Sequence, residues 1–361
     1  MLELTGTDPK RWGEQHGESF KDDIRTIYDI RLALTLGRTD LGSKDNVLAL
    51  ARHHLPVLQR FDQALFDELC GIARGAGLAP EQIVVVNHYT DLRDLTRKDL
   101  ARLEGAAPSD PGGCSALFLQ QGKDRILAQT WDMHGSAEPY ALLIKVPSLP
   151  PTPKTNPAGI PKLGSTLLFS ITGCLGMTGM TSWGTALTIN NLNSVDATVG
   201  VVWPAVVRRA LREPNAKAMR DLVMAAPIGS GRHYILADDV DVFGIETSGT
   251  KKKIIRDGGR GPYFHTNHCV DDEMIGTCKI LPGSTTLQRY ATLGELVKKK
   301  LPDDLQSVFN ALEPVGLKQN LTNPHDVATC GALAMDLTLR NAMACVGIPG
   351  PNADSLVVEV R

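Results

Sequence analysis

Apolar residues recur at helical spacing in the first hundred residues of the chain. One apolar face lies in residues 20–28 and a second in residues 65–72. Gly37 follows the first face and Gly75 follows the second, and glycine is common where helices end. The pattern predicts that residues 9–105 are helical, with two or three amphipathic helices.

After about residue 113 the spacing of apolar residues changes to every second position, as in a β-strand. Residues 104–113, EGAAPSDPGG, hold prolines and glycines that disfavour both helix and strand, so we expect an exposed loop that ends at Cys114. Residues 115–120 and 125–132 alternate in polarity around a turn at 122–124. This predicts a β-hairpin with Cys114 at its first position and with faces that differ in burial.

The rest of the chain mixes strands and helices in blocks. Six prolines between Pro147 and Pro161 indicate a surface excursion, and helical patterns return near 203–225 and 285–300. The strand-like segments are LLFSIT, ALTINNL, YILADD, VFGIET, GALAMDLTL, AMACVG and LVVEV. Blocks of strands and helices without strict alternation predict an α+β fold in which helices cover antiparallel sheets.

Composition narrows the class of protein. The 361 residues are 42% hydrophobic and 22% charged with a net charge of −2, which is typical of a globular domain and offers no basic field for nucleic acid. No apolar stretch approaches the roughly 18 residues of a membrane span, and the N-terminus does not resemble an export signal. Seven scattered cysteines without a C-x-x-C pair favour the reducing cytoplasm over a disulfide framework.

Cys114 directly follows Gly113. A thiol is activated by a histidine, by a helix N-terminus, or by a free α-amine once the preceding peptide bond is cut, and Gly113 favours the third route because glycine tolerates strained backbone. Attack of the Cys114 thiol on the Gly113 carbonyl and hydrolysis of the thioester would leave Cys114 as a new N-terminus. An amine pKa of about 7.7–8.0 lies near the thiol pKa of about 8.5, so proton transfer between them is cheap.

Several short motifs support this chemistry by their order and spacing. They are W-G-E-Q-H-G at 12–17, E-L-C-G-I-A-R-G-A at 68–76, I-V-V-V-N at 83–87, G-C-S at 113–115, Q-T-W-D at 129–132, T-I-N-N-L at 188–192 and H-T-N-H-C at 265–269. Together they resemble the N-terminal-nucleophile (Ntn) hydrolases, specifically the penicillin acyltransferase branch (isopenicillin N acyltransferase, peptidase family C45), and more distantly the choloylglycine hydrolases.

The resemblance implies an αββα sandwich, two antiparallel sheets between helical layers. It implies cleavage between Gly113 and Cys114 into a helical segment 1–113 and a catalytic segment 114–361, which stay together as a heterodimer within one domain. A higher homo-oligomer is left open.

The resemblance also assigns supporting residues. Asp132, which antiparallel pairing would bring beside Cys114, would orient the amine and thiol. Asn190 lies in an apolar strand, so its amide needs a partner, and in the family such an asparagine helps form the oxyanion hole; Asn191 is the alternative alignment. Asn267 would support the nucleophile or the tetrahedral intermediate, and Arg289 would lower the thiol pKa.

Two departures from the family pattern concern the substrate more than the nucleophile. Penicillin acyltransferases tend to have Asp-Gly-Cys-Thr at the cleavage site, where this chain has Gly112, Gly113, Cys114 and Ser115. Near the C-terminus the fungal enzyme has Ser-Arg-Gly, and residues 329–331 read Thr-Cys-Gly, without the arginine.

Other classes of site are less well supported. A zinc site would use His265, His268, Cys269 and Cys278, but their spacing matches no trusted pattern, so we expect no metal. Asp238, Asp239 and Asp241 suggest a polar hairpin turn more than a calcium site.

Two alternatives concern the role of Cys114. A papain-like protease would need Cys114 at a helix N-terminus with a histidine such as His265 or His325. A catalytically inactive member of the fold that binds an acyl ligand is the non-enzymatic alternative.

The sequence therefore predicts a self-processing cysteine hydrolase or acyltransferase that needs no cofactor. Its expected substrate is a small N-acylated amine, amino acid or peptide-like metabolite. Hydrolysis is favoured because an acyltransferase must also bind an acceptor.

Overall fold

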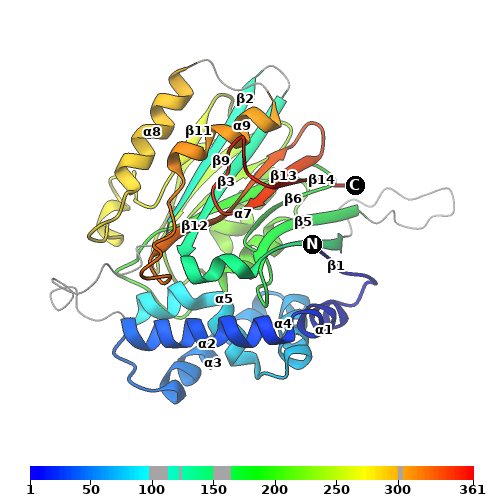
Figure 1. Ribbon diagram of the computed structural model, residues 1–361, viewed down its shortest axis with the longest axis vertical. Coiled ribbons are helices and arrows are strands. Elements are labelled where there is room, and N and C mark those ends of the chain that lie inside the picture. The colour runs from blue at the N-terminus through cyan, green and yellow to red at the C-terminus, as the bar shows by residue number, and fades with distance from the viewer. Residues whose placement is uncertain (97–112, 122–123, 149–163, 300–303) are drawn as a thin grey trace.

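The computed structural model describes residues 1–96, 113–121, 124–148, 164–299 and 304–361. Two stacked β-sheets lie at its centre with helices outside both of them (Figure 1). The fold is α+β, as predicted. Residues 104–112 and 149–161 of the expected loops, and positions 122 and 123 of the expected turn, lie outside the described residues.

Residues 1–96, the described part of the chain before the cysteine, form five helices, so the expectation of two or three is wrong. They are α1 (Pro9–Ser19), α2 (Lys21–Arg38), α3 (Lys44–Phe61), α4 (Gln63–Ala76) and α5 (Pro80–Leu95). The breaks between helices are one to five residues long, and the side chains of Asp8, Ser43 and Asp62 cap the helices that follow. Such breaks interrupt the apolar period too briefly to be recognised in the sequence.

Two of the sequence motifs meet where α1 crosses α4. A Cβ atom on Gly13 would lie 2.0 Å from the carbonyl oxygen of Glu68, and one on Gly17 would lie 2.4 Å from that of Ile72. Gly71 and Gly75 face α1 in the same way. The glycines, spaced four apart in each helix, therefore allow the two backbones to touch.

The larger sheet has eight strands in the order β1-β4-β5-β6-β7-β8-β9-β10. They are β1 (Leu2–Glu3), β4 (Ala141–Ser148), β5 (Gly164–Ile171), β6 (Thr178–Thr181), β7 (Ala186–Asn191), β8 (Arg232–Ala237), β9 (Val242–Thr247) and β10 (Lys252–Asp257). All neighbours are antiparallel except β1, which pairs parallel with β4. Strands β1, β4, β6 and β10 were not among the predicted segments.

The smaller sheet has six strands in the order β11-β2-β3-β12-β13-β14, all antiparallel. They are β11 (Tyr263–His265), β2 (Gly113–Gln121), β3 (Asp124–His134), β12 (Val327–Asp336), β13 (Asn341–Val346) and β14 (Ser355–Glu359). Strand β11 was not predicted, because three residues are too few to show a period.

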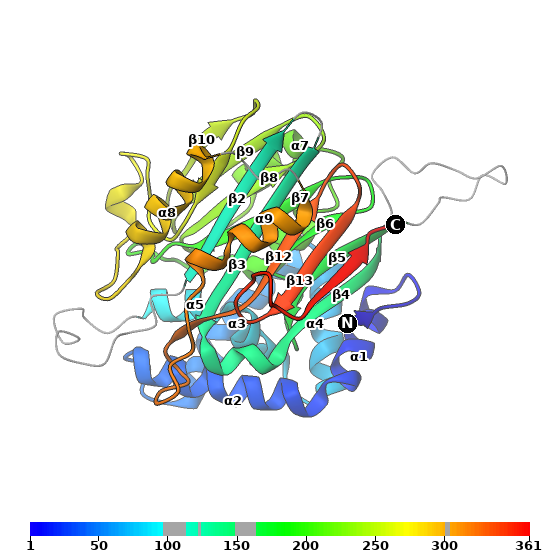
Figure 2. The same ribbon diagram turned by 45° about the horizontal axis from the view of Figure 1, so that its top comes forward.

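Helices cover the outer face of each sheet. Helices α8 (Thr286–Lys298) and α9 (Leu305–Ala311) pack on the six-stranded sheet, and Figure 2 shows α9 lying across β3, β12 and β13. Helices α6 (Trp203–Ala210) and α7 (Ala216–Ala225) lie on the other side together with α1–α5. The helical patterns expected near 203–225 are thus two helices, the second capped by Asn215.

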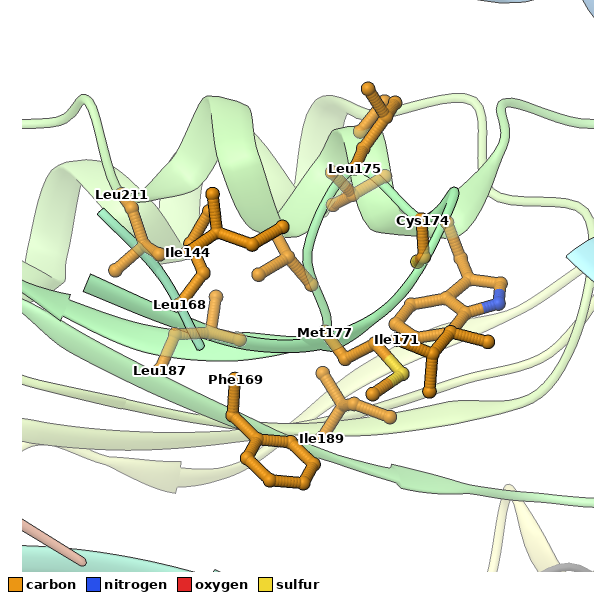
Figure 3. Close-up of a cluster of buried hydrophobic side chains, with 14 of the residues drawn as sticks. Ile144, Leu168, Phe169, Ile171, Cys174, Leu175, Met177, Leu187, Ile189 and Leu211 are labelled. Carbon is orange, nitrogen blue, oxygen red and sulfur yellow. The ribbon is translucent and has the colours of Figure 1, made fainter. Parts of the chain in front are cut away.

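The main core lies between the sheets and beneath the helices. Figure 3 shows part of it around β5, where Leu168 and Phe169 occupy opposite faces of one strand. The Phe169 ring reaches the six-stranded sheet at Gly331, where a Cβ atom would lie 2.6 Å from the ring. Within the described ranges, no single helix is long and apolar enough to cross a membrane; α4 and α5 pass that test only together, as a pair bent by 113°.

Candidate active site

Cys114 lies on the hairpin that the sequence predicted. Strands β2 and β3 pair so that Cys114 faces Trp131 and Gly113 faces Asp132. Cys114 is the second residue of β2, not the first, and both faces of the hairpin are buried. The expected difference between the faces is wrong because the eight-stranded sheet covers one side and α8 and α9 cover the other.

Three distant side chains hold the main chain of Cys114. Its N–H donates to Oδ1 of Asn267 at 2.8 Å. Its carbonyl oxygen accepts from Nδ2 of Asn190 at 3.0 Å and from Nη1 of Arg289 at 2.8 Å. The structure therefore brings together, at one residue, side chains from β7, α8 and the loop that follows β11.

Asn267 and Arg289 also bind each other. Nη2 of Arg289 donates to Oδ1 of Asn267 at 2.8 Å, and Nη1 donates to Oγ of Ser115 at 2.9 Å. The Asn267 N–H donates to Oγ1 of Thr286 at 2.7 Å. Both ends of Asn267 are thus fixed, and its Oδ1 accepts from a cation as well as from Cys114.

Asp132 is fully buried beside the bond that precedes Cys114. Its Oδ1 accepts from Oγ1 of Thr329 at 2.7 Å, while Oδ2 has no hydrogen-bond partner among the described residues and lies 3.9 Å from Nη1 of Arg289. Burial raises the pKa of this carboxyl, and Arg289 and the threonine hydroxyls oppose the rise.

The same carboxylate explains the glycine. A Cβ atom on Gly113 would lie 2.7 Å from Cβ and 2.9 Å from Oδ2 of Asp132. No side chain fits there without moving one strand of the hairpin. Gly113 is extended and does not have a positive φ, so steric exclusion, and not the backbone strain expected from the sequence, accounts for the glycine.

The thiol of Cys114 is closed off in the continuous chain. The residue is 2% exposed, and burial, reinforced by the negative charge of Asp132, raises the thiol pKa to about 12 despite the opposing effect of Arg289. On the order of one thiol in 10⁵ is then ionised at pH 7. The thiol needs a proton acceptor and a less buried setting to become a good nucleophile.

The two adjacent asparagines have different roles. Asn190 turns its side chain toward Cys114, whereas Oδ1 of Asn191 accepts from Nη1 of Arg232 at 2.8 Å. Asn191 contributes to the site through its main chain, because its carbonyl oxygen accepts from Nδ2 of Asn267 at 2.9 Å. The alternation of side chains along β7 produces this separation.

Sequence reasoning missed several residues of this network. Thr286 and Thr329 bind the candidate residues directly, and Gln129 ties β3 to the main chain of Ile189 on the facing sheet. Gln129 belongs to the Q-T-W-D motif, and Thr329 belongs to the Thr-Cys-Gly segment already noted in the sequence, so both had a signal. Thr286 had none.

The residues considered for a zinc or a calcium site have other partners in the structure. Among the described residues, no group of three or more His, Cys, Asp or Glu could hold a metal ion. His265 instead binds the carboxylate of Glu246 at 2.9 Å. Oδ1 of Asp238 accepts from the N–H groups of Val240 and Asp241 at 2.7 Å, which confirms a polar turn between β8 and β9.

The described residues around Cys114 do not form a papain-like arrangement. Cys114 lies inside a strand and not at a helix N-terminus. Nδ1 of His325 hydrogen-bonds to Oγ of Ser136 at 2.9 Å, and the Cys114 contacts described above involve no histidine.

Two cavities formed by described residues lie away from the thiol. One, of about 390 Å³, opens between the rims of the two sheets and is lined by Phe169, Val346 and Leu356 among others. The other, of about 250 Å³, lies beside Trp12 and Arg208. Cys114 lines neither of them, in keeping with its buried thiol.

Residues 119–319 match the family described as "AAT: Acyl-coenzyme A:6-aminopenicillanic acid acyl-transferase". The chain belongs to this family. The matched range contains Asp132, Asn190, Asn267 and Arg289 and begins just after Cys114. The resemblance to penicillin acyltransferases inferred from the motifs is confirmed.

A curated relative of this acyltransferase family member is the acyl-coenzyme A:6-aminopenicillanic-acid-acyltransferase 40 kDa form of Emericella nidulans. The two are 24% identical over 306 residues, which cover 82% of this chain and 77% of the relative.

Solved structures with a similar chain include two bacterial enzymes. A mutant of conjugated bile acid hydrolase from Clostridium perfringens has 12% identity and a TM-score of 0.47, over 68% of this chain and 92% of that one. Penicillin V acylase from Agrobacterium tumefaciens has 15% identity and a TM-score of 0.46, over 68% and 86%.

Proposed function

We propose that this protein is a self-processing cysteine hydrolase or acyltransferase with Cys114 as its nucleophile. The observation that carries the proposal is the set of hydrogen bonds that hold the main chain of Cys114, with Asn267 at the nitrogen of the peptide bond to Gly113 and Asn190 and Arg289 at the carbonyl oxygen of Cys114. The Asn190 amide and the Arg289 guanidinium are donors of the kind that stabilise an oxyanion in acyl transfer.

The first reaction is cleavage of the chain. The Cys114 sulfur attacks the Gly113 carbonyl carbon, the bond to the Cys114 nitrogen breaks, and that nitrogen takes up the thiol proton. A thioester between Gly113 and the sulfur results, and water hydrolyses it to a Gly113 carboxylate and a free Cys114. Asp132 lies against Gly113, where its carboxylate can accept a proton from the water.

The second reaction uses the new amine. The amine stays near Oδ1 of Asn267, which accepts one of its hydrogens and so directs its lone pair to the thiol. The thiolate attacks the acyl carbonyl of the substrate, and Nδ2 of Asn190 with a backbone N–H donates to the oxyanion. The leaving group departs with a proton from the amine, and the acyl thioester passes to water or to an amine acceptor.

Cleavage of the peptide bond after Gly113 is also expected to make the Cys114 thiol less buried. Once residue 113 is free to leave, the space beside Cys114 opens to solvent or substrate, and the desolvation penalty that raises the thiol pKa decreases.

A donor such as asparagine in an oxyanion hole contributes a factor of about 10²–10³ to the reaction rate.

We propose that fragments 1–113 and 114–361 remain associated in one domain. Buried contacts between the two segments support this. Both Nη atoms of Arg208 bind the Glu68 carboxylate, at 2.7 and 2.9 Å, and Arg232 pairs with Asp91. The strand pairing of β1 with β4 also joins the two segments.

The substrate class follows from this chemistry and from the family. The Emericella relative is named for an acyl thioester donor and an amine acceptor, and we propose for this chain a small N-acyl amine or acyl thioester, with hydrolysis favoured. The seven cysteines are all free thiols, in keeping with the cytoplasmic location that we propose.

The test begins with denaturing mass analysis of the purified protein. The wild type should yield fragments 1–113 and 114–361, and the matured protein should deacylate members of a panel of N-acyl compounds offered with and without amine acceptors. Cys114→Ala should abolish both processing and turnover, while Cys70→Ala, which removes a thiol from α4, should retain both.

Two results would contradict the proposal. One is a Cys114→Ala protein that still turns over the panel, and the other is active enzyme whose sole N-terminus is Met1. An intact and inactive wild type that binds an acyl compound would favour the ligand-binding alternative.

A further inference from the structure

A buried line of polar groups continues from Asn190 away from Cys114. His233 on β8 pairs with Asn190 across the strands, and its Nδ1 lies 3.1 Å from Oδ1 of Asn190. Its Nε2 lies 2.8 Å from the Tyr263 hydroxyl. Both Asn190 and His233 are fully buried, so neither amide nor ring has water as an alternative partner.

The contacts determine where the protons lie. Nδ2 of Asn190 donates to the Cys114 carbonyl, so the Asn190 oxygen faces His233 and accepts. Nδ1 of His233 must then carry a proton, which leaves Nε2 of the neutral ring as an acceptor for the Tyr263 hydroxyl. One tautomer of His233 satisfies all of these partners.

A second histidine opposes further protonation of the first. The His265 ring stacks on His233 with centroids 3.6 Å apart and planes within 11°. Its Nδ1 lies 2.7 Å from the Thr266 carbonyl oxygen and its Nε2 lies 2.9 Å from the Glu246 carboxylate, so the ring is held in place on both sides. Burial and the neighbouring His265 lower the pKa of His233 well below its ordinary value, which keeps the ring neutral.

The strand next to His233 leaves space for the tyrosine. A Cβ atom on Gly244 would lie 2.1 Å from the Tyr263 hydroxyl oxygen, so only glycine at this position of β9 lets that hydroxyl reach His233. The line Tyr263, His233, Asn190 is therefore built from three strands of two sheets.

We propose that His233 is a positioning residue for the reaction at Cys114: its Nδ1–H binds the Asn190 oxygen and thereby keeps the Asn190 Nδ2 group, which donates to the Cys114 main chain, turned toward the place where the oxyanion forms. The inference rests on the proposed role of Asn190 as an oxyanion donor. Tyr263 acts one step further out, because its O–H holds the His233 tautomer. An amide released from His233 can rotate and present oxygen instead of nitrogen to the oxyanion, which is repulsive.

The experiment compares variants that differ in one donor. His233→Asn places an amide N–H at the same bond distance from Cα as Nδ1, whereas His233→Leu fills the space without a donor. The probe is p-nitrophenyl butyrate, with rates normalised to the amount of fragment 114–361 found by mass analysis. A variant that matures too slowly for this assay is compared by its rate of processing.

We expect His233→Leu to lower kcat by about 10–100-fold and to change KM by less than about threefold. This loss in kcat is smaller than the roughly 10²–10³-fold loss expected when the oxyanion donor itself is removed. His233→Asn should recover most of this loss. Tyr263→Phe should slow the reaction less than His233→Leu, and adding it to His233→Leu should have no further effect, because both act through one amide.

The outcomes separate the inference from the proposed function. Wild-type rates in Asn190→Ala would refute Asn190 as an oxyanion donor and with it the proposed mechanism. A slow Asn190→Ala with a wild-type His233→Leu would overturn the role of His233 alone. If His233→Leu slows the Asn190→Ala protein as strongly as it slows the wild type, His233 acts by another route and the inference is wrong.

Discussion

Replacing His16 by glutamine is expected to make the protein less sensitive to acid. His16 is 1% exposed, and its Nε2 accepts a hydrogen bond from the Gly173 N–H at 2.9 Å. Burial, with a smaller contribution from Arg208, lowers its pKa to about 3. A proton on Nε2 would remove the acceptor and place a charge in the core, so the folded state resists protonation.

The sign follows from proton binding in the two states. Below about pH 6.5 the unfolded chain binds a proton at His16, and the folded chain does so only near pH 3. The free energy of unfolding therefore falls as the pH decreases through this window, by about 1.4 kcal/mol per pH unit and about 5 kcal/mol in all. Above pH 6.5 the group has no effect on the slope.

Urea unfolding at a series of pH values from 7 to 4 measures this slope. A Cys114→Ala background keeps the chain whole, so that unfolding is unimolecular. His16→Gln offers an amide oxygen to the Gly173 N–H and cannot titrate. The slope of its unfolding free energy against pH should therefore be shallower than the parent's, by an amount equivalent to the uptake of up to one proton. His53→Gln is the matched control, because His53 is exposed on α3 and its replacement should leave the slope unchanged. Equal slopes for the parent and His16→Gln would refute the reasoning.

Two further predictions concern packing and charge. Gly113→Ala should slow self-processing by about tenfold or more, because its methyl group would lie 2.7 Å from the Asp132 Cβ and such overpacking costs about 1–3 kcal/mol. Gly37→Ala is the control, because its methyl group meets nothing within 4 Å, and it should process normally. Equal processing rates in the two variants would count against the clash. Glu68→Gln should lower the free energy of unfolding by about 3–5 kcal/mol, since it leaves Arg208 buried without its charge partner; a urea midpoint equal to that of the parent would contradict this.

The short motifs in the sequence acquire separate physical reasons in the structure. Gly13 and Gly71 belong to two motifs and let α1 and α4 touch. Asn87, from a third motif, bonds to the carbonyl of Gly173 and the N–H of Leu175 behind the eight-stranded sheet. These residues stabilise the helical layer and do not touch Cys114. Motif membership alone therefore does not separate packing residues from candidate catalytic ones.

Local patterns in the sequence were sufficient for the hairpin, most of the longer strands and the α+β class, because the period of apolar residues records which faces are buried. The position of Cys114 after Gly113 also had a local chemical meaning. Short elements such as β11 and α9 carried too few residues to show a period, and the short breaks between the N-terminal helices concealed their number.

Only the tertiary structure decided how the candidate site is assembled. Asn190, Asn267 and Arg289 are 76, 153 and 175 residues from Cys114, and the contacts between them depend on the stacking of two sheets and one helix. The choice between Asn190 and Asn191, and the role of His233 behind it, depend on which face of a strand each side chain occupies. A sequence determines its local periods directly, whereas long-range register is set by the packing of the whole chain.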